Sequence, residues 1–229
     1  MPLVINPLGD NPQQPGIYAE TYLPDQLLAG RFMPVTENIT LGAGTLQRGT
    51  VLGQQTLGAA ASVAGKPAGG ANTGNGTISA VALEANAAVG AYVITMTGAT
   101  TFTVEAPDGA QLAGGETGVA YNDRIGFTIT AGGTAFTAGD GFTVTVAAGS
   151  GNFVASVATA ADGSQVPAAI LADYADASGG AVVAPAYLTG EFNQDKVTFD
   201  ASWTLAALTP LLRARSIFLK SFVSAADPT

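Results

Sequence analysis

The side chains that carry out most acid–base and nucleophilic chemistry in proteins are missing from this chain. Its 229 residues include no His and no Cys, which removes the usual general base, the thiolate nucleophile and the commonest zinc ligands. A Ser–Lys pair is the next candidate, but no serine stands at the Ser-x-x-Lys spacing before Lys66, Lys196 or Lys220. Carboxylate chemistry is the route that remains.

Three aspartates in one stretch could form a paired-carboxylate site of the kind that glycosidases use, namely Asp162, Asp173 and Asp176. Asp162 and Asp176 lie beside Gly or Ser in turn-like sequence, where an aspartate side chain accepts hydrogen bonds from nearby backbone N–H groups. We therefore expect these aspartates to stabilise turns, and we expect that the protein is not an enzyme.

Calcium is the other chemistry that these carboxylates allow. Asp108, Asp123 and Asp140 supply hard oxygen ligands near turns. Their spacing does not match an EF-hand loop, and residues 132–136 depart from the calcium-binding nonapeptide repeat. Residues 139–141 also lack the Lys-Ser/Thr tail of a phosphate loop. We expect hairpin turns here, with no metal and no cofactor.

The charge balance argues against nucleic acid as a partner. Eight basic residues face 17 acidic ones, a formal charge of -9 that would repel a phosphate backbone. No apolar run approaches the roughly 20 residues of a membrane span, and no basic segment with a long apolar core marks a secretory signal. The absence of Cys suits folding in a reducing cytoplasm. We expect no contact with nucleic acid or membrane.

The elements that must position any site are predicted to be strands, because the chain has 30 Gly, 12 Pro and only 11% charged residues. Residues 1–30 carry several prolines and scattered aromatics, which is typical of an extended arm or of a frayed terminus. Residues 32–41 are the better candidate for a strand that joins another protein's sheet edge. Its candidate contact residues are Phe32, Val35, Ile39 and Leu41.

The middle of the chain alternates apolar and polar residues with the period of a half-buried strand. Buried positions are predicted at Tyr92, Ile94 and Met96, and again at Phe142 and Val144. Gly-rich stretches lie on both sides, including a predicted flexible linker at 54–76. We interpret residues 67–151 as an antiparallel, β-sandwich-like domain inserted through Gly-rich linkers.

The flanking segments, 31–66 and 152–229, are then predicted to form one discontinuous, mixed β-rich domain. Its centre is a hairpin of short buried strands at 168–171 and 182–184, with turns at 179–180 and 189–192. The spacing of leucines after Trp203 predicts a short helix, with Thr209-Pro210 as its cap and first-turn proline. The whole chain is predicted to be mainly β with minor α.

Four patches of the flanking segments, taken in order, resemble the phage head decoration protein D family. They are Gly42-Ala43-Gly44 with Arg48-Gly49-Thr50-Val51-Leu52-Gly53; Asp162-Gly163-Ser164-Gln165 with Ala169-Ile170-Leu171; Leu188-Thr189-Gly190-Glu191-Phe192-Asn193; and Leu211-Leu212-Arg213-Ala214-Arg215 with Ile217-Phe218-Leu219-Lys220. The middle block resembles the additional β domain of larger members. The chain departs from the family in its long arm before Phe32 and in the large insert.

The resemblance implies a homotrimeric cement protein on the outer surface of the expanded phage head, assembled in the host cytoplasm. It also implies that the major capsid protein is the partner and that the arm joins its sheet. Such a protein would stabilise the head against the pressure of packaged DNA. The alternative is a surface- or carbohydrate-binding adhesin or fibre module, in which the inserted domain binds the ligand and the flanking domain oligomerises.

Overall fold

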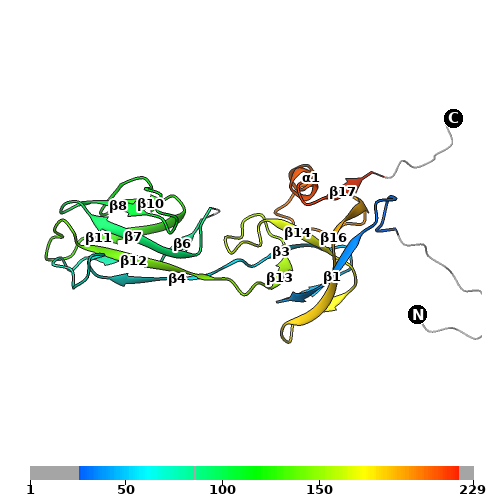
Figure 1. Ribbon diagram of the computed structural model, residues 1–229, viewed down its shortest axis with the longest axis horizontal. Helices are drawn as coiled ribbons and strands as arrows, with labels where there is room; N and C mark the ends of the chain where they lie inside the picture. Colours follow the sequence, from blue (N-terminus) through cyan, green and yellow to red (C-terminus); the bar gives the residue numbers. More distant parts are fainter. Residues whose placement is uncertain (1–25, 85, 222–229) are drawn as a thin grey trace, which may run out of the picture.

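The computed structural model describes residues 26–84 and 86–221. The fold is mainly β, with one helix among the described residues, which confirms the predicted fold class. Two lobes lie along the long axis of the molecule (Figure 1). We call them the barrel lobe, which holds both ends of the described chain, and the distal lobe, which contains residues 57–148. No helix in the described part of the chain is long and apolar enough to cross a membrane.

The barrel lobe is a small closed sheet. Its strands, in spatial order, are β1 (Val35–Leu41), β13 (Phe153–Ala155), β3 (Val51–Gln54), β14 (Pro167–Leu171) and β16 (Val182–Asn193). The barrel closes because β1 also pairs antiparallel with β16 along its whole length. A sixth strand, β17 (Ile217–Lys220), pairs in parallel with the far end of β16. A two-stranded ribbon of β2 (Thr45–Leu46) and β15 (Ala175–Asp176) lies beside the barrel.

Neighbouring residues on the barrel strands supply two different cores, because successive side chains in a strand point to opposite faces. Leu52 and Leu171 pack with Ile39 and Leu41 in one cluster. Val51 and Ile170, the residues before them, belong to a second cluster that includes the helix. The rest of that second cluster is Leu27, Phe192, Val197, Leu208, Leu212 and Ile217. Residues from both flanking segments therefore contribute to the same two clusters.

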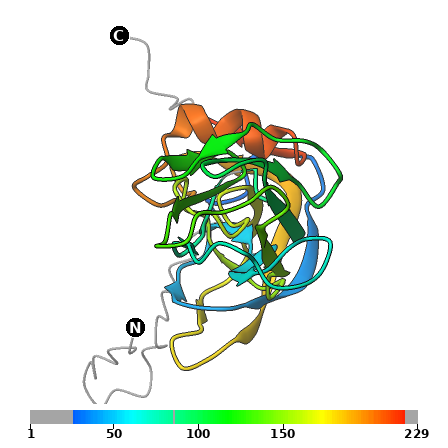
Figure 2. The ribbon, with the colours of Figure 1, turned by 90° about the vertical axis from the view of Figure 1, so that its left-hand side faces the viewer.

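The helix α1 (Leu205–Arg213) covers the second cluster with Leu208 and Leu212. Seen from the distal lobe, it lies on the opposite side of the barrel from the connection that leads into β16 (Figure 2). The predicted cap at Thr209-Pro210 is wrong. Thr204 is the N-cap and its side chain accepts from the Ala207 N–H, so Pro210 lies inside the helix.

The distal lobe is built from two sheets that share one core. The larger sheet has the order β4 (Leu57–Ala64), β12 (Gly141–Ala148), β7 (Gly90–Met96), β8 (Thr101–Glu105) and β9 (Gly115–Glu116). The smaller one contains β5 (Thr77–Ile78), β6 (Ala82–Leu83), β10 (Ala120–Asn122) and β11 (Ile125–Thr130). Tyr92, Ile94, Met96, Phe142 and Val144 are all buried, as their alternation predicted.

Residues 54–76, which the sequence suggested were a flexible linker, contain the strand β4. The two crossings between the lobes form a neck of paired backbone. Gln55 N–H donates to the Asn152 carbonyl at 2.9 Å, and Gly149 N–H donates to the Thr56 carbonyl at 2.9 Å. The two-stranded ribbon β3–β13 of the barrel thus continues into β4–β12 of the distal lobe. The prediction missed this because Ala and Gly are poor strand formers in isolation, and pairing with β12 decides the outcome.

The predicted central hairpin differs in a similar way. β14 pairs with β16 at Ile170 and Tyr187, so the connection between them is long and β15 lies within it. The expected turn at 189–192 is strand: β16 continues to Asn193 and pairs there with β17. Gly190 pairs with Ile217, which lies 27 residues further along the chain. This pairing overrides the local turn signal of Thr-Gly.

Candidate functional site

The four residues that the sequence proposed for a partner contact lie in or just before β1, and the structure separates them into two pairs. Phe32 and Val35 are exposed, at 47% and 54% of their residue surface. Ile39 and Leu41 are buried, at 6% and 0%, inside the barrel's own core. Only the first pair therefore presents its side chains to a partner, and contact with one stays a prediction.

The described chain begins as an extended segment held against the end of β16. Leu27 is buried, its carbonyl accepts from the Asn193 N–H at 2.8 Å, and Ala29 N–H donates to the Glu191 carbonyl at 2.9 Å. Leu28 forms an isolated bridge with Phe192. Of the predicted arm, residues 1–25 lie outside the described residues, whereas 26–30 follow the barrel wall. This attachment of 26–30 had no signal in the sequence.

The carboxylate of Glu191 fixes the next part of that segment. It accepts from the backbone N–H of Arg31 at 2.9 Å and of Phe32 at 3.4 Å, and it forms an ion pair with the Lys220 ammonium at 2.6 Å. The hydrogen bond from Lys220 is the largest effect and, with the two backbone donors, holds the pKa of Glu191 below its usual range against the opposing effect of burial. A Cβ on residue 30 would overlap the Glu191 side chain, which explains Gly30.

An exposed apolar patch follows this anchor. Met33 is 84% exposed, and its neighbours Phe32 and Val35 are also exposed. The Phe32 ring packs edge-on against Phe218 of β17, with ring centroids 6.0 Å apart. Large apolar side chains gathered at the point where the described chain begins are typical of a protein contact.

One edge of β1 is also open along most of its length. The strand pairs with β16 from Val35 to Leu41, but on its other side only Leu41 pairs, with Phe153 of β13. The outward backbone groups of residues 35–40 have no strand partner among the described residues. An open edge next to an exposed apolar patch is the kind of surface on which another protein can add a strand.

Two of the three aspartates that the sequence analysis considered for catalysis, Asp162 and Asp176, stabilise turns. Asp162 accepts from Ser164 N–H at 3.0 Å and from the Gln55 side chain at 2.8 Å, across the neck. Burial tends to raise the pKa of Asp162, but these donors hold it below the usual value. Asp176 accepts from Ser178 N–H at 3.0 Å and from the Thr45 hydroxyl at 2.9 Å, and the Ser178 bonds are the main reason that its pKa is lowered.

The calcium candidates are engaged in similar ways. Asp140 is fully buried, and its carboxylate accepts from the N–H groups of Thr73, Gly74 and Thr137, each at 2.9 Å. Burial tends to raise the pKa of Asp140, but these three donors and the Lys66 ammonium at 3.7 Å hold it far below the usual value. Its oxygens face donors, which is the environment of an anion and not of a cation site.

Asp108 likewise pairs with a cation of the protein, since it accepts from the Arg124 guanidinium at 2.8 Å. That hydrogen bond is the main cause that lowers the pKa of Asp108. Among the residues that the structure describes, no group of three or more acidic side chains is placed to hold a metal ion.

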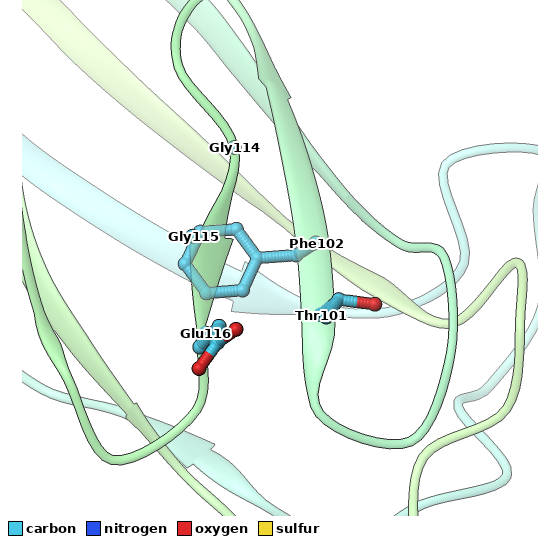
Figure 3. Close-up of a pocket in the computed structure, with 5 residues that line it drawn as sticks. All are labelled: Thr101, Phe102, Gly114, Gly115 and Glu116. Atoms are coloured by element: carbon cyan, nitrogen blue, oxygen red, sulfur yellow. The ribbon is translucent and has the colours of Figure 1, made fainter.

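The distal lobe has a shallow surface pocket of about 270 Å³, drawn in Figure 3 and lined by Thr101, Phe102, Gly114, Gly115 and Glu116. Its floor is the Phe102 ring, against which Gly115 lies so closely that a Cβ there would overlap the ring. Phe102 itself is only 2% exposed and packs with the aromatic cluster of the core. The ring is therefore not an open surface on which a sugar could stack.

The chain belongs to the family of bacteriophage lambda head decoration protein D, whose family model matches residues 17–210. That family is structural and not enzymatic, and membership assigns the chain to the decoration of a phage capsid. The match confirms the resemblance that the sequence patches indicated.

Two other comparisons add little. Among solved structures, two crystal structures of Xanthomonas campestris FlgL are similar to this chain, both at 21% identity and a TM-score of 0.31. The similarity covers 44% and 43% of this chain but only 33% and 31% of the FlgL chains. The chain thus spans about a third of the length of those structures. A search of curated proteins finds no match.

Proposed function

We propose that the chain trimerises on the outer surface of the expanded head of a phage and ties capsid subunits together against the pressure of packaged DNA. One observation carries this proposal. Both ends of the described chain lie at the same end of the molecule, and the distal lobe lies at the other (Figure 1). A protein with this arrangement can grip a shell at one end while its other end extends into the surroundings.

The gripping end is the anchor at Glu191 with the apolar patch and the open edge of β1. The described chain joins the barrel there, and the Glu191 carboxylate, paired with Lys220, holds the backbone N–H groups of Arg31 and Phe32. We propose the major capsid protein as the partner of this end. Phe32, Met33 and Val35 would cover apolar side chains of that partner, and a strand of the partner would pair with β1.

Trimerisation would multiply a modest contact. Three arms on one rigid body bind neighbouring subunits at a high effective concentration, so the affinity of the trimer for a shell greatly exceeds that of one arm. The distal lobe is proposed to be an inserted domain that projects outward. The hydrogen-bonded neck at residues 55–56 and 149–152 would keep it upright, away from the shell.

The decisive experiment compares heads before and after expansion. The purified full-length chain should bind expanded heads and should not bind unexpanded heads, as measured by electron microscopy and by co-sedimentation. Removal of residues 1–25 should weaken binding without changing the thermal unfolding of the barrel, because that deletion leaves Leu27 and β1 in place. Undiminished binding by the shortened chain would remove the arm from the mechanism.

A matched control separates the arm from the patch beside it. Met33→Ser changes an exposed side chain that makes no core contact, whereas Ile39→Ser would disrupt the barrel core. Met33→Ser should weaken binding to heads with unchanged stability. Sedimentation equilibrium of the chain in solution and image averaging on heads would measure the trimer directly.

A further inference from the structure

The strand β4 forms one edge of the larger sheet in the distal lobe. It pairs with β12 over residues 57–64, and its other edge has no strand partner among the described residues. Figure 1 shows β4 at the outer margin of that sheet, beside β12. Residues 61–64 of β4 are all exposed. A complete row of backbone donors and acceptors therefore faces outward.

The register identifies which groups these are. Gly65 N–H donates to the Gly141 carbonyl, and in the same ladder Val63 lies opposite Thr143 and Ala61 opposite Thr145. Because the N–H and C=O of one residue in an antiparallel strand point to the same side, and alternate residues point to opposite sides, these odd-numbered residues face β12. The backbone groups of residues 60, 62 and 64 are then the ones that face outward.

This edge lacks the features with which proteins usually prevent strand addition, namely charged side chains, prolines, bulges and short length. Residues 57–64 read Leu-Gly-Ala-Ala-Ala-Ser-Val-Ala, without a charge or a proline. The one register irregularity lies near Leu57, at the neck end. Lys66, the nearest cation, is turned inward to Asp140 at 3.7 Å and Thr73 at 3.2 Å.

Two other open edges are better protected. β9 is only two residues long and carries Glu116 at its end. β1 carries Glu37, which is exposed, in its middle. The edges of β9 and β1 therefore have protection that the edge of β4 lacks.

We propose that the β4 edge pairs with the β4 edge of a second copy, antiparallel and about a two-fold axis at Ser62. Each copy has a formal charge of -9, so two copies can approach closely only where the seam itself is uncharged, as it is along β4. Residue 62 then faces its own counterpart and residue 60 faces residue 64 of the second copy. Two hydrogen bonds for each of these pairs give about six across the seam.

The pairing would join the two larger sheets into one continuous sheet. A two-fold contact of this kind is self-complementary, so each seam joins two copies and no more. On a phage head its consequence rests on the proposed function. Distal lobes of neighbouring trimers that meet across a two-fold axis would be linked above the shell, in addition to their attachment below.

A charge swap tests the geometry. In the proposed register Ala61 lies directly opposite residue 63 of the second copy, and both side chains are exposed. The double variant Ala61→Glu/Val63→Glu places like charges opposite each other twice and should weaken the association about ten-fold. Ala61→Lys/Val63→Glu places opposite charges there and should restore association.

The measurement is sedimentation equilibrium of the full-length chain over a range of concentrations. The expected result is reversible association of the wild type and of the Lys/Glu variant to at least twice the mass of the Glu/Glu variant. Wild-type mass that does not double, or doubles equally in the Glu/Glu variant, overturns the proposal. If the Glu/Glu variant is monomeric, the proposed trimer fails in solution while the edge pairing stands.

A second measurement does not depend on the charges. Because the chain has no Cys, Ser62→Cys introduces a single thiol, which the two-fold axis brings opposite its counterpart at a Cα separation of about 5.5 Å, within disulfide range. Mild oxidation should give a disulfide-linked pair. Thr103→Cys, an exposed position inside the same sheet, is the matched control and should stay unlinked. Equal linking of the two variants, or none of Ser62→Cys, overturns the register.

Discussion

The two lobes have separate cores, and we predict that they unfold separately. The distal cluster contains Val144 and the barrel cluster contains Val51, both buried and both in central strands. Val144→Ala should lower the melting temperature of the distal lobe and leave the barrel unchanged. Val51→Ala, the same chemical change in the other lobe, should do the reverse.

The size of the shift follows from the residues removed and from the size of the lobe. Val→Ala deletes two buried methyl groups at about 0.8 kcal/mol each, and the remaining cavity brings the loss to about 2 kcal/mol. A lobe of roughly 90 residues has an unfolding entropy of about 0.19 kcal/mol/K at its melting temperature. The distal transition should therefore fall by about 10 °C.

Differential scanning calorimetry of the full-length chain measures both transitions in one experiment. Circular dichroism of each variant at 25 °C confirms that the folded content is unchanged before heating. One transition that moves by the same amount in both variants would refute the reasoning. It would mean that the neck couples the lobes into one cooperative unit, and the proposal of an inserted domain with its own stability would be wrong.

Three further predictions concern single interactions. Asp140→Asn should lower the melting temperature of the distal lobe. Because the pKa of Asp140 is held below its unfolded value, the contribution of Asp140 to stability is complete above about pH 4 and is lost as the pH falls further. Calorimetry from about pH 7 to about pH 3 should therefore show a steeper decline in the melting temperature of the wild type than of the variant. Glu191→Gln should speed hydrogen exchange of the two backbone amides that this carboxylate binds, and Lys220→Ala should do so less; equal protection in all three proteins would contradict the anchor. Gly49→Ala should destabilise the barrel more than Gly44→Ala. Both residues have φ near +90°, where a side chain costs about 1–2 kcal/mol. Only at Gly49 would the added Cβ also lie 2.7 Å from a backbone carbonyl oxygen. Urea titration measures the difference.

The sequence predicts strands well where each strand buries one face. Tyr92, Ile94 and Met96 are buried and alternate with less buried residues, because one side of β7 faces the core and the other faces outward. The period alone then specifies which side chains are buried. The four patches that resemble the family could also be recognised from the sequence. They lie on turns and strands whose residue types are locally constrained, such as Gly49 with its positive φ.

The sequence predicts poorly where pairing with a distant segment decides the structure. β4 is composed of small residues with weak strand preference, and β12, about 80 residues away, makes it a strand. Ile39 and Leu41 alternate as an arm strand would, yet closure of the barrel by β16 buries them. The contact of Glu191 with the N–H groups of residues 31 and 32 could not be predicted from the sequence, because it joins residues about 160 positions apart.

The neck also determines how a mechanical load would travel through the protein. A ribbon of two antiparallel strands runs from β3 and β13 directly into β4 and β12. A pull on the far end of the distal lobe stretches both strands along their length at the same time, so they share the tension and do not slide past one another. Liquid flowing past a particle would therefore strain this ribbon evenly, and the force would reach the barrel wall at two neighbouring strands and not at a single thread.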